Sequence, residues 1–412
     1  LPIDRAFAVA GFGTVVTGTA YSGILKQGSE VTLLPQERNA RIRSIQVHGS
    51  DVQEAWAGQR IAMSLSGVSL DELERGDVVC ERGVYHGTKC FDVSFRLLPS
   101  SPGNLKHWQR VRLHVGTSDV VARVSLLDRS NLSPGEECFG QIITEEEIVT
   151  KVGERFVIRL YSPLMTIGGG EVLSPHGKKA RGRKSREEDL KRLMLLSRAD
   201  SSLERMKVLI HSYGKLSLRE LILMVQDKGE NILNWANYLA QKEETVPLGS
   251  TDKIFLSREY AMALKEEIVT FLNEFHQEYP HQRGLSAEKI MENLDFTLDQ
   301  RSFKSFLGYL QDKHVIRTTD GVVSLSDFTP KDETAIRESA TAFLSFCRER
   351  NYQFPTFSEL KEHLAMEDNA FTDLVSHLRT EGDISIIGGE YVITMELEKD
   401  ILEKLPGIRD NI

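Results

Sequence analysis

Few residues in this sequence have the type and spacing that nucleotide chemistry requires. Gly11 and Gly13 follow a predicted strand, as in the start of a dinucleotide-binding loop. Such a loop needs a third glycine three residues later and a helix behind it, because the pyrophosphate lies on the helix N-terminus. Residues 15–18 instead continue as a strand. The sequence also has no GxxxxGK[S/T] stretch, whose backbone N–H groups cradle phosphates. These residues are therefore not expected to hydrolyse GTP on their own, and no catalytic residue is predicted.

Cysteine and histidine side chains show no metal-binding spacing. The four cysteines are scattered, with no CxxC pair: Cys80, Cys90, Cys138 and Cys347. Reduced cysteines, partly buried in cores, are the expected state, and they indicate a cytoplasmic protein. The histidines, such as His48, His86, His107 and His114, are expected on the surface or satisfied in a core. No metal site is predicted.

One basic run stands out near the middle of the chain. It consists of Lys178, Lys179, Arg181, Arg183, Lys184 and Arg186. One interpretation is a solvated linker, because most runs of charged residues are exposed to water and need no binding partner. A contact to an RNA backbone is the alternative, because residues 86–185 hold 15 Lys and Arg against 10 Asp and Glu. Residues 1–85 hold 8 against 10 and residues 186–412 hold 28 against 40, so phosphate contacts are expected only around the middle segment.

The elements that carry these residues change type along the chain. Up to about residue 176, short β-branched runs alternate with glycine-rich turns, which is typical of tightly bent antiparallel strands. A break near Gly83–Gly87 divides the strands into two predicted β-barrels, at 1–85 and 86–176. The basic segment 177–192 is predicted to be a linker.

Beyond the linker, amphipathic helices follow a repeated plan of three helices and a hairpin. Leu221, Ile290 and Leu360 occupy equivalent apolar positions, 69 and 70 residues apart. This periodicity predicts tandem winged-helix domains. Their ranges are 193–258, 259–328 and 329–396, and residues 397–412 would begin a further unit that stops early.

Composition excludes several other classes. The chain has 412 residues, 40% hydrophobic and 27% charged, which is ordinary for a soluble protein of several domains. No apolar run approaches the roughly 18 residues that span a bilayer, so no membrane partner is expected. The N-terminus has neither a signal-peptide pattern nor an initiator methionine, which suggests that the chain was cut from a longer one.

The barrel segments resemble the second and third domains of translational GTPases. The resemblance lies in DRAFAVAGFGTVVTGTAYSGILKQGSEVTLLP at 4–35, RIRSIQVHG at 41–49, AGQRIAMSLSG at 57–67, RGDVVC at 75–80 and RFVIRLYSPLMTIGGGEVL at 155–173. Within that superfamily, the IDRAF opening and the winged-helix tail are similar to bacterial selenocysteine-specific elongation factors. The fold that this implies is two antiparallel β-barrels followed by tandem winged helices, without the GTPase domain and most of the last winged helix.

The resemblance implies a pocket for the aminoacyl group. Its members here are Asp4, Arg5 and Arg60. A selenol is more acidic than a thiol, whose pKa is about 8.5, so selenocysteine is a selenolate at neutral pH. Two guanidiniums stay charged and can donate to this anion. A charge-assisted hydrogen bond contributes about 1.5–3 kcal/mol, which corresponds to roughly 10–100-fold discrimination against seryl-tRNA per contact. A strand-end ion pair without a ligand is the alternative interpretation.

The same resemblance implies the partners and cofactors. They are selenocysteinyl-tRNA, the ribosome and an mRNA hairpin, with GTP and Mg²⁺ bound by the domain outside this chain. In such factors the last winged helix grips the hairpin, so this chain is expected to bind the hairpin poorly. The three winged-helix units are acidic, and only the helix at 299–313 is mildly basic. Two rival functions are a translational-GTPase relative with no amino acid pocket and a winged-helix regulator that binds DNA.

Overall fold

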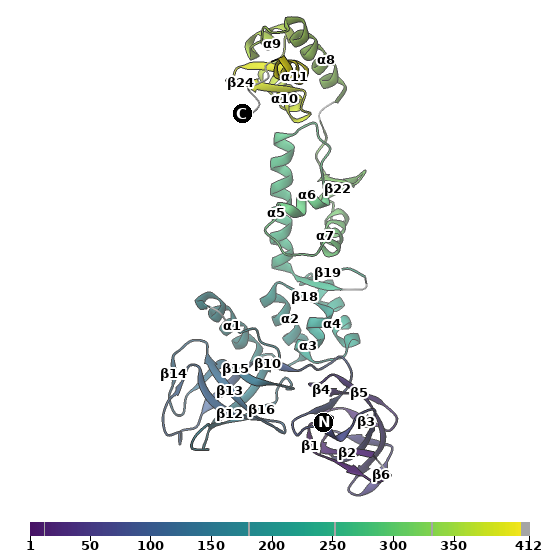
Figure 1. Cartoon of the computed structure of the whole chain (residues 1–412), viewed down its shortest axis with the longest axis vertical. Helices are drawn as coiled ribbons and strands as arrows, with labels where there is room; N and C mark the ends of the chain where they lie inside the picture. Colours follow the sequence, from purple (N-terminus) through teal and green to yellow (C-terminus); the bar gives the residue numbers. More distant parts are fainter. Residues whose placement is uncertain (12, 180–181, 251–252, 331–332, 405–412) are drawn as a thin grey trace. The chain divides into compact units, whose positions relative to one another are not determined.

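The computed structural model describes residues 1–11, 13–179, 182–250, 253–330 and 333–404. Within it the chain forms two compact units, Leu1–Ala261 and Met262–Ile412. The first unit contains the β-rich part and one set of helices, and the second contains two further sets (Figure 1).

The chain up to Cys80 forms a seven-stranded antiparallel sheet. Its path is β1-β2-β8-β5-β4-β9, with β6 paired to β5. The strands are β1 Ile3–Val9, β2 Gly13–Thr19, β4 Glu30–Leu34, β5 Arg38–Val47, β6 Ser50–Val52, β8 Arg60–Ser66 and β9 Val78–Cys80. A separate ribbon joins β3 Ile24–Lys26 to β7 Glu54–Trp56, and a 3-10 turn covers Leu70–Glu72.

Backbone contacts bring the two ends of this sheet together. Pro2 bridges Val78, and the Ile3 N–H donates to the Asp77 carbonyl at 2.7 Å. Apolar side chains on alternate positions, such as Ile3, Val16 and Ile61, fill the interior and are at most 1% exposed. The barrel predicted at 1–85 therefore corresponds to a curved sheet with its own core, although its strand path is not closed.

The second predicted barrel is confirmed as a closed barrel of six strands in the order β10-β15-β13-β12-β16-β17. They are β10 Thr88–Leu97, β12 Gln109–Val115, β13 Ser118–Leu126, β15 Glu137–Ile148, β16 Arg155–Leu160 and β17 Thr166–Ser174, with a small ribbon of β11 Leu105–Lys106 and β14 Asn131–Leu132. Closure requires glycine in β17, because a Cβ on Gly170 would lie 2.0 Å from the Ser94 carbonyl oxygen. Val111, Leu113 and Val115 show the alternation that fills the interior.

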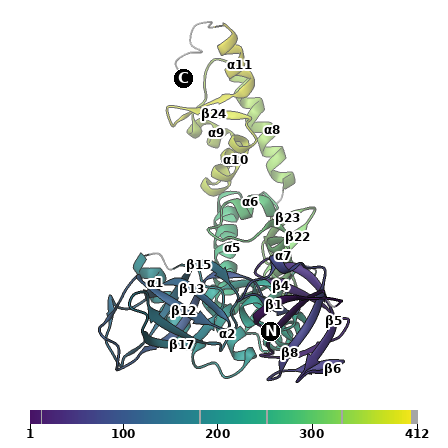
Figure 2. The same cartoon turned by 60° about the horizontal axis from the view of Figure 1, so that its bottom comes forward.

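The segment predicted as a basic linker differs from expectation. Helix α1 spans Gly182–Leu196 and packs against β10 and β15. Both views show it beside β15 (Figures 1 and 2). Leu193 and Leu196 are at most 1% exposed. These two apolar residues lie just beyond the linker predicted at 177–192. The same helix extends back into that segment, where Asp189 and Arg192 are also buried, so the second half of the segment is part of the folded structure.

Three sets of helices follow the predicted plan of three helices and a hairpin. The first set is α2 Ser202–Tyr213, β18 Lys215–Ser217, α3 Leu218–Val225, α4 Gly229–Gln241, β19 Thr245–Leu248 and β20 Ile254–Ser257. The second is α5 Arg258–Glu278, β21 Leu285–Ser286, α6 Ala287–Glu292, α7 Gln300–Asp312, β22 Ile316–Thr319 and β23 Val322–Leu325. The third is α8 Glu333–Arg350, α9 Phe357–Leu364, α10 Asp368–Thr380, β24 Ile384–Ile387 and β25 Tyr391–Thr394, followed by α11 Met395–Lys404.

The repeated apolar positions account for this plan. Leu221, Ile290 and Leu360 are each 0% exposed and lie on the second helix of their sets. Each of these helices begins after a hydroxyl residue whose side chain caps it: Ser217, Ser286 and Thr356. The tail after residue 397 contains most of α11, and residues 405–412 lie outside the described residues. No helix among the described residues has the length and apolar character to cross a membrane.

Loss of one cap is expected to weaken its helix set. In the capping box at Ser217, the Ser217 hydroxyl accepts from the Glu220 N–H and the Glu220 carboxylate accepts from the Ser217 N–H. Ser217→Ala is expected to lower the free energy of unfolding of this region by about 1 kcal/mol. Ser217→Thr keeps a hydroxyl and is expected to lose much less. Hydrogen exchange of the amides of α3 measures both, and equal protection in Ser217→Ala and the parent chain would contradict the prediction.

Candidate functional site

The candidate pocket begins at a β-bulge in strand β1. Ile3 pairs with Gly18 and Arg5 with Thr17, so Asp4 is the extra residue that has no partner in the ladder. Ile3 is in the core and Ala6 packs against the same core. The bulge therefore places two consecutive side chains, Asp4 and Arg5, on the outer face of the sheet.

Gly18 makes this bulge possible. A Cβ at Gly18 would lie 2.1 Å from the carbonyl oxygen of Pro2, a distance that no side chain tolerates. The glycine lets the start of β1 approach β2 closely. The local geometry of Asp4 thus depends on a residue of the GTVVTG stretch in the neighbouring strand.

Three side chains from three adjacent strands meet on the outer face. The Arg60 guanidinium donates to Asp4 Oδ2 at 2.7 Å, and the Thr17 hydroxyl donates to Asp4 Oδ1 at 2.5 Å. The Arg60 side chain remains 58% exposed, whereas that of Asp4 is 23% exposed. The structure therefore brings Asp4 and Arg60 together and adds Thr17, while the role of these residues as an aminoacyl pocket stays a prediction.

The charge of Asp4 is maintained by its neighbours. Partial burial raises the pKa of Asp4, but the hydrogen bonds from Thr17 and Arg60 and the positive charges of Arg60 and Arg5 outweigh this effect. The net result is a pKa below the usual value for an aspartate. Asp4 is therefore ionised at neutral pH and neutralises one of the two guanidiniums.

Arg5 occupies a different environment from Arg60. The ion pairs among the described residues engage Arg60 but not Arg5, whose side chain is exposed. Phe7, which is 41% exposed, follows two residues later on the same strand and on the same face. Sequence reasoning missed Thr17 and Phe7, although strand alternation from Arg5 to Phe7 was a signal that could have suggested the latter.

The basic run forms several contacts on the barrel side of α1. The Lys179 ammonium lies 4.1 Å from the centre of the Trp108 ring, and an Arg186 nitrogen lies 3.4 Å from His107 Nε2. Arg183 pairs with Glu187 at 2.8 Å and is 93% exposed. Lys178 and Lys184 are also exposed, whereas Arg181 lies outside the described residues. Of the described members, Lys179 and Arg186 thus contact the closed barrel, and a contact between the basic run and RNA stays a prediction.

A second cationic surface covers the outer face of the closed barrel. Arg112 in β12 stands directly opposite Arg159 in β16, and Arg110 stands opposite Arg123 in β13. Like charges in facing positions are destabilising. Asp119 and Glu145 offset part of the repulsion, at 2.8 Å from Arg112 and 3.0 Å from Arg110. Sequence reasoning found only the excess charge of this segment, although arginine at alternate positions of QRVRLHV was the signal for a single face.

Comparison with known proteins connects these features to one family. The model for elongation factor Tu domain 2 matches residues 13–80. The β-barrel domain of selenocysteine-specific elongation factors matches residues 92–179, and a winged-helix domain of elongation factor SelB matches residues 269–325. This chain belongs to the family of selenocysteine-specific elongation factors.

Relatives in this family match across both parts of the chain. The selenocysteine-specific elongation factor of Desulfomicrobium baculatum is 32% identical over 291 residues, which cover 71% of this chain and 46% of the relative. That of Haemophilus influenzae is 24% identical over 374 residues, covering 89% of this chain and 57% of the relative. This chain therefore spans about half the length of these selenocysteine-specific factors.

A solved structure agrees on the fold. The crystal structure of a bacterial selenocysteine-specific elongation factor, EF-Sec, superposes with a TM-score of 0.59 over 98% of this chain and 61% of that chain, at 20% sequence identity. Together with the family matches, it confirms a domain of the elongation factor Tu type, the closed barrel and a winged helix in the second helix set. The winged-helix assignment of the first and third sets remains a prediction.

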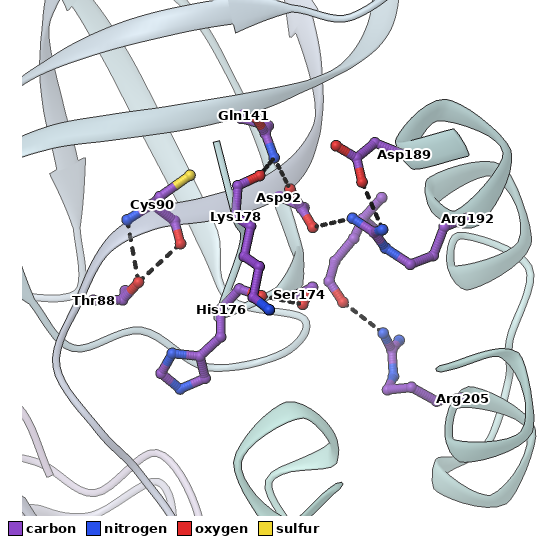
Figure 3. Close-up of polar contacts among 11 residues, drawn as sticks. Thr88, Cys90, Asp92, Gln141, Ser174, His176, Lys178, Asp189, Arg192 and Arg205 are labelled. Carbon is purple, nitrogen blue, oxygen red and sulfur yellow. Dashed lines mark hydrogen bonds and ion pairs between the residues drawn. The ribbon is translucent and has the colours of Figure 1, made fainter. Parts of the chain in front are cut away.

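A buried charge network joins the closed barrel to helices α1 and α2 (Figure 3). Asp92 in β10 is 0% exposed and accepts from Gln141 at 2.8 Å and from Arg192 of α1 at 3.1 Å. Arg192 also contacts Asp189 at 2.6 Å and lies over the Tyr213 ring of α2 at 4.8 Å. Arg205 of α2 donates to the Leu173 carbonyl at 2.6 Å. These contacts fix α1 and α2 on the barrel.

The described residues form neither a metal site nor a reactive thiol. Among the described residues no three His, Cys, Asp or Glu side chains gather as metal ligands would. Burial raises the pKa of Cys90 and Cys138 to about 12, and of Cys80 and Cys347 to about 11, so these thiols are poor nucleophiles. All four cysteines are free, in agreement with their predicted reduced state.

Proposed function

We propose that the full-length protein delivers selenocysteinyl-tRNA to the ribosome at UGA codons that encode selenocysteine, and that this chain tests the amino acid. One observation carries the proposal: the Asp4–Arg60 pair on the outer face of the first sheet has the exposed Arg5 beside it. Two guanidiniums and one carboxylate leave a single positive charge. A site of this kind suits one monovalent anion.

The chemistry of the amino acid explains why this charge would select. Selenocysteine reaches the site as a selenolate, while serine is neutral and its hydroxyl cannot compensate a cation. A neutral ligand displaces part of the water around a guanidinium without supplying a negative charge. Binding of that ligand therefore costs free energy. The site therefore rejects serine by leaving its charge unmatched, in addition to binding selenium.

The body of the tRNA is proposed to lie against the arginine-rich outer face of the closed barrel. Arg110, Arg112 and Arg159 lie on that face, where phosphates would compete with Glu145 for Arg110 and with Asp119 for Arg112. RNA binding would relieve the repulsion between the facing pairs. The exposed part of the basic run, including Lys178 and Lys184, is a second candidate for backbone contacts. Phosphate contacts would position the tRNA, and the pocket would read the amino acid.

Other parts of the function follow from family membership. GTP and Mg²⁺ would bind to a GTPase domain outside these 412 residues. The helix sets, assigned as winged helices at 193–258, 259–328 and 329–396, would connect the barrels at 1–85 and 86–176 to the unit that holds the mRNA hairpin. A cytoplasmic location is part of the proposal, since the ribosome is the partner.

Binding of three aminoacyl-tRNAs to the full-length factor with GTP tests the proposal. Selenocysteinyl-, cysteinyl- and seryl-tRNA with the same tRNA body differ only in one side-chain group. Selenocysteinyl-tRNA is expected to bind most tightly and seryl-tRNA least tightly. Because a thiol has a pKa of about 8.5, the affinity for cysteinyl-tRNA is expected to rise severalfold between pH 7 and 8.5. The affinity for seryl-tRNA is expected to stay constant.

The variant Arg60→Ala links this preference to the pocket. Removal of the Arg60 guanidinium leaves Asp4 free to neutralise Arg5. The preference for selenocysteinyl- over seryl-tRNA is therefore expected to fall by roughly 10–100-fold. An unchanged preference in Arg60→Ala would reject the pocket. Equal affinity of the unmodified factor for the two tRNAs would instead favour a translational GTPase that does not test the amino acid.

A further inference from the structure

Thr17 is a residue of the candidate pocket that holds no charge and lies beneath the carboxylate of Asp4. Its hydroxyl donates to Asp4 Oδ1 at 2.5 Å, while Arg60 occupies Oδ2 at 2.7 Å. Each oxygen of the carboxylate therefore has its own donor. The two donors come from β2 and β8, the neighbouring strands of the same sheet.

Asp4 needs such a tie because of its position in the bulge. As the extra residue of β1, it lacks the ladder pairing that fixes the backbone of its neighbours. Its side chain lies between two arginines, one in the next position of the chain and one across two strands. Without the Thr17 hydroxyl, the carboxylate could turn towards either guanidinium, since an exposed ion pair has no strong geometric preference.

The direction of the carboxylate decides which arginine keeps its charge available. When Asp4 faces Arg60, Arg60 is paired and Arg5 is the guanidinium that remains for an anion. When Asp4 faces Arg5, these two neighbouring residues neutralise each other, and the unpaired positive charge is then that of Arg60 on β8. The position of the positive charge relative to the amino acid thus depends on the hydrogen bond from Thr17.

We propose that Thr17 is a positioning residue for amino acid selection, which holds Asp4 on Arg60 so that Arg5 binds the selenolate. This inference rests on the proposed function, because it assigns roles within the same pocket. Thr17 acts through Asp4 and does not itself contact the amino acid. Arg5 supplies the charge, and Arg60 with Asp4 forms the wall that keeps Arg5 unpaired.

The variant Thr17→Val tests this role. Valine has the same shape and suits a strand, so the sheet is expected to form, while Oδ1 of Asp4 loses its donor. The ratio of affinities for selenocysteinyl- and seryl-tRNA is expected to fall about tenfold in the full-length factor with GTP. The pH dependence of cysteinyl-tRNA binding is expected to flatten, because the charge that attracts the thiolate is partly neutralised.

Two matched variants separate positioning from structure. Thr17→Ser keeps the hydroxyl and is expected to restore most of the preference. Thr14→Val removes a hydrogen bond from the same strand, since the Thr14 hydroxyl donates to the Val68 carbonyl at 3.1 Å, but it does not touch Asp4. Thr14→Val is therefore expected to leave the preference unchanged. Hydrogen exchange of the amides of β1 and β2 in all three variants reports whether the sheet is intact.

The possible results distinguish this inference from the proposed function. A lower preference in Thr17→Val that Thr17→Ser restores supports the positioning role. A preserved preference in Thr17→Val, or an equal loss of affinity for both tRNAs, overturns it while the pocket itself stands. Equal binding of both tRNAs by the unmodified factor overturns the proposed function and this inference with it.

Discussion

Replacing Asp92 with alanine is expected to destabilise the closed barrel by about 3–5 kcal/mol. Asp92 is fully buried, and both of its oxygens accept hydrogen bonds, from Gln141 and from Arg192. The pKa of Asp92 is raised, chiefly by burial and also by the nearby Asp189, while the Arg192 charge and the Gln141 hydrogen bond oppose the rise. With N–H donors on both oxygens, the side chain has the geometry of a carboxylate. Its removal leaves the Arg192 guanidinium, 6% exposed, with one carboxylate partner, Asp189, in place of two.

Two further variants identify the cause of this loss. The triple variant Asp92→Leu, Asp189→Asn and Arg192→Met removes all three charges of the network and is expected to recover much of the stability. Arg183→Ala breaks an ion pair whose arginine is 93% exposed, and is expected to change stability by less than about 1 kcal/mol. Similar effects of Asp92→Ala and Arg183→Ala would contradict the prediction.

The measurement must report on the barrel itself. A chain of several domains does not unfold in one step, so a single melting temperature mixes their stabilities. Hydrogen exchange of the amides in β10 and β15 isolates the barrel, because these strands pair along most of their length. The free energy of opening of these amides under native conditions is the quantity to compare between the variants.

This network marks a limit of sequence reasoning. Arg192 is the last residue of the segment that the sequence predicted to be a solvated linker. That prediction followed from the run of six basic residues that precedes Arg192 in the segment. Its partner Asp92 is 100 positions earlier in an apolar strand, where periodicity gives no reason to expect a charge pair. Strand alternation predicts which face a residue occupies, but it does not predict what packs against that face.

Periodicity succeeded where local signals determine local structure. The predicted plan of three helices and a hairpin is present around Leu221 and Leu360, which lie on α3 at Leu218–Val225 and on α9 at Phe357–Leu364. Their boundaries could be predicted because Ser217 and Thr356 satisfy backbone N–H groups within the same short segment. The closed barrel could be predicted as strands, while its order depends on pairings between distant segments that the sequence does not encode locally.

In the pocket, too, the sequence predicted some features and the structure was needed for others. Family resemblance supplied Asp4, Arg5 and Arg60, and the structure brings Asp4 and Arg60 into contact. Neither resemblance nor alternation predicted that Asp4 is the extra residue of a bulge, because a bulge is visible only in the register between β1 and β2. Thr17 owes its place beneath the carboxylate to that register. The different environments of the two arginines therefore required the structure.

Reversing the charge of Arg112 and Arg159 together is expected to weaken tRNA binding by the full-length factor about 100-fold at roughly 0.1 M salt. Four units of charge change, and each is worth roughly 1 kcal/mol or less at a wet interface after screening. The dependence of affinity on salt is expected to become shallower, by a slope of about 0.7–0.9 for each phosphate that the variant no longer neutralises. Affinities for selenocysteinyl- and seryl-tRNA should fall equally, because this face is proposed to bind the tRNA body.

The matched control is the same reversal on the opposite side of the barrel. Lys89 and Arg96 are exposed residues of β10, which is three strands away from β12 around the closed ring. Lys89→Glu with Arg96→Glu changes the net charge of the protein by the same amount and is expected to have a small effect on affinity. Equal decreases in affinity for the two double variants would mean that the total charge, and not this face, attracts the tRNA. A selective decrease in Arg112→Glu with Arg159→Glu would show why the barrel keeps two arginines opposite each other: the repulsion in the free protein is relieved by phosphates when the tRNA binds.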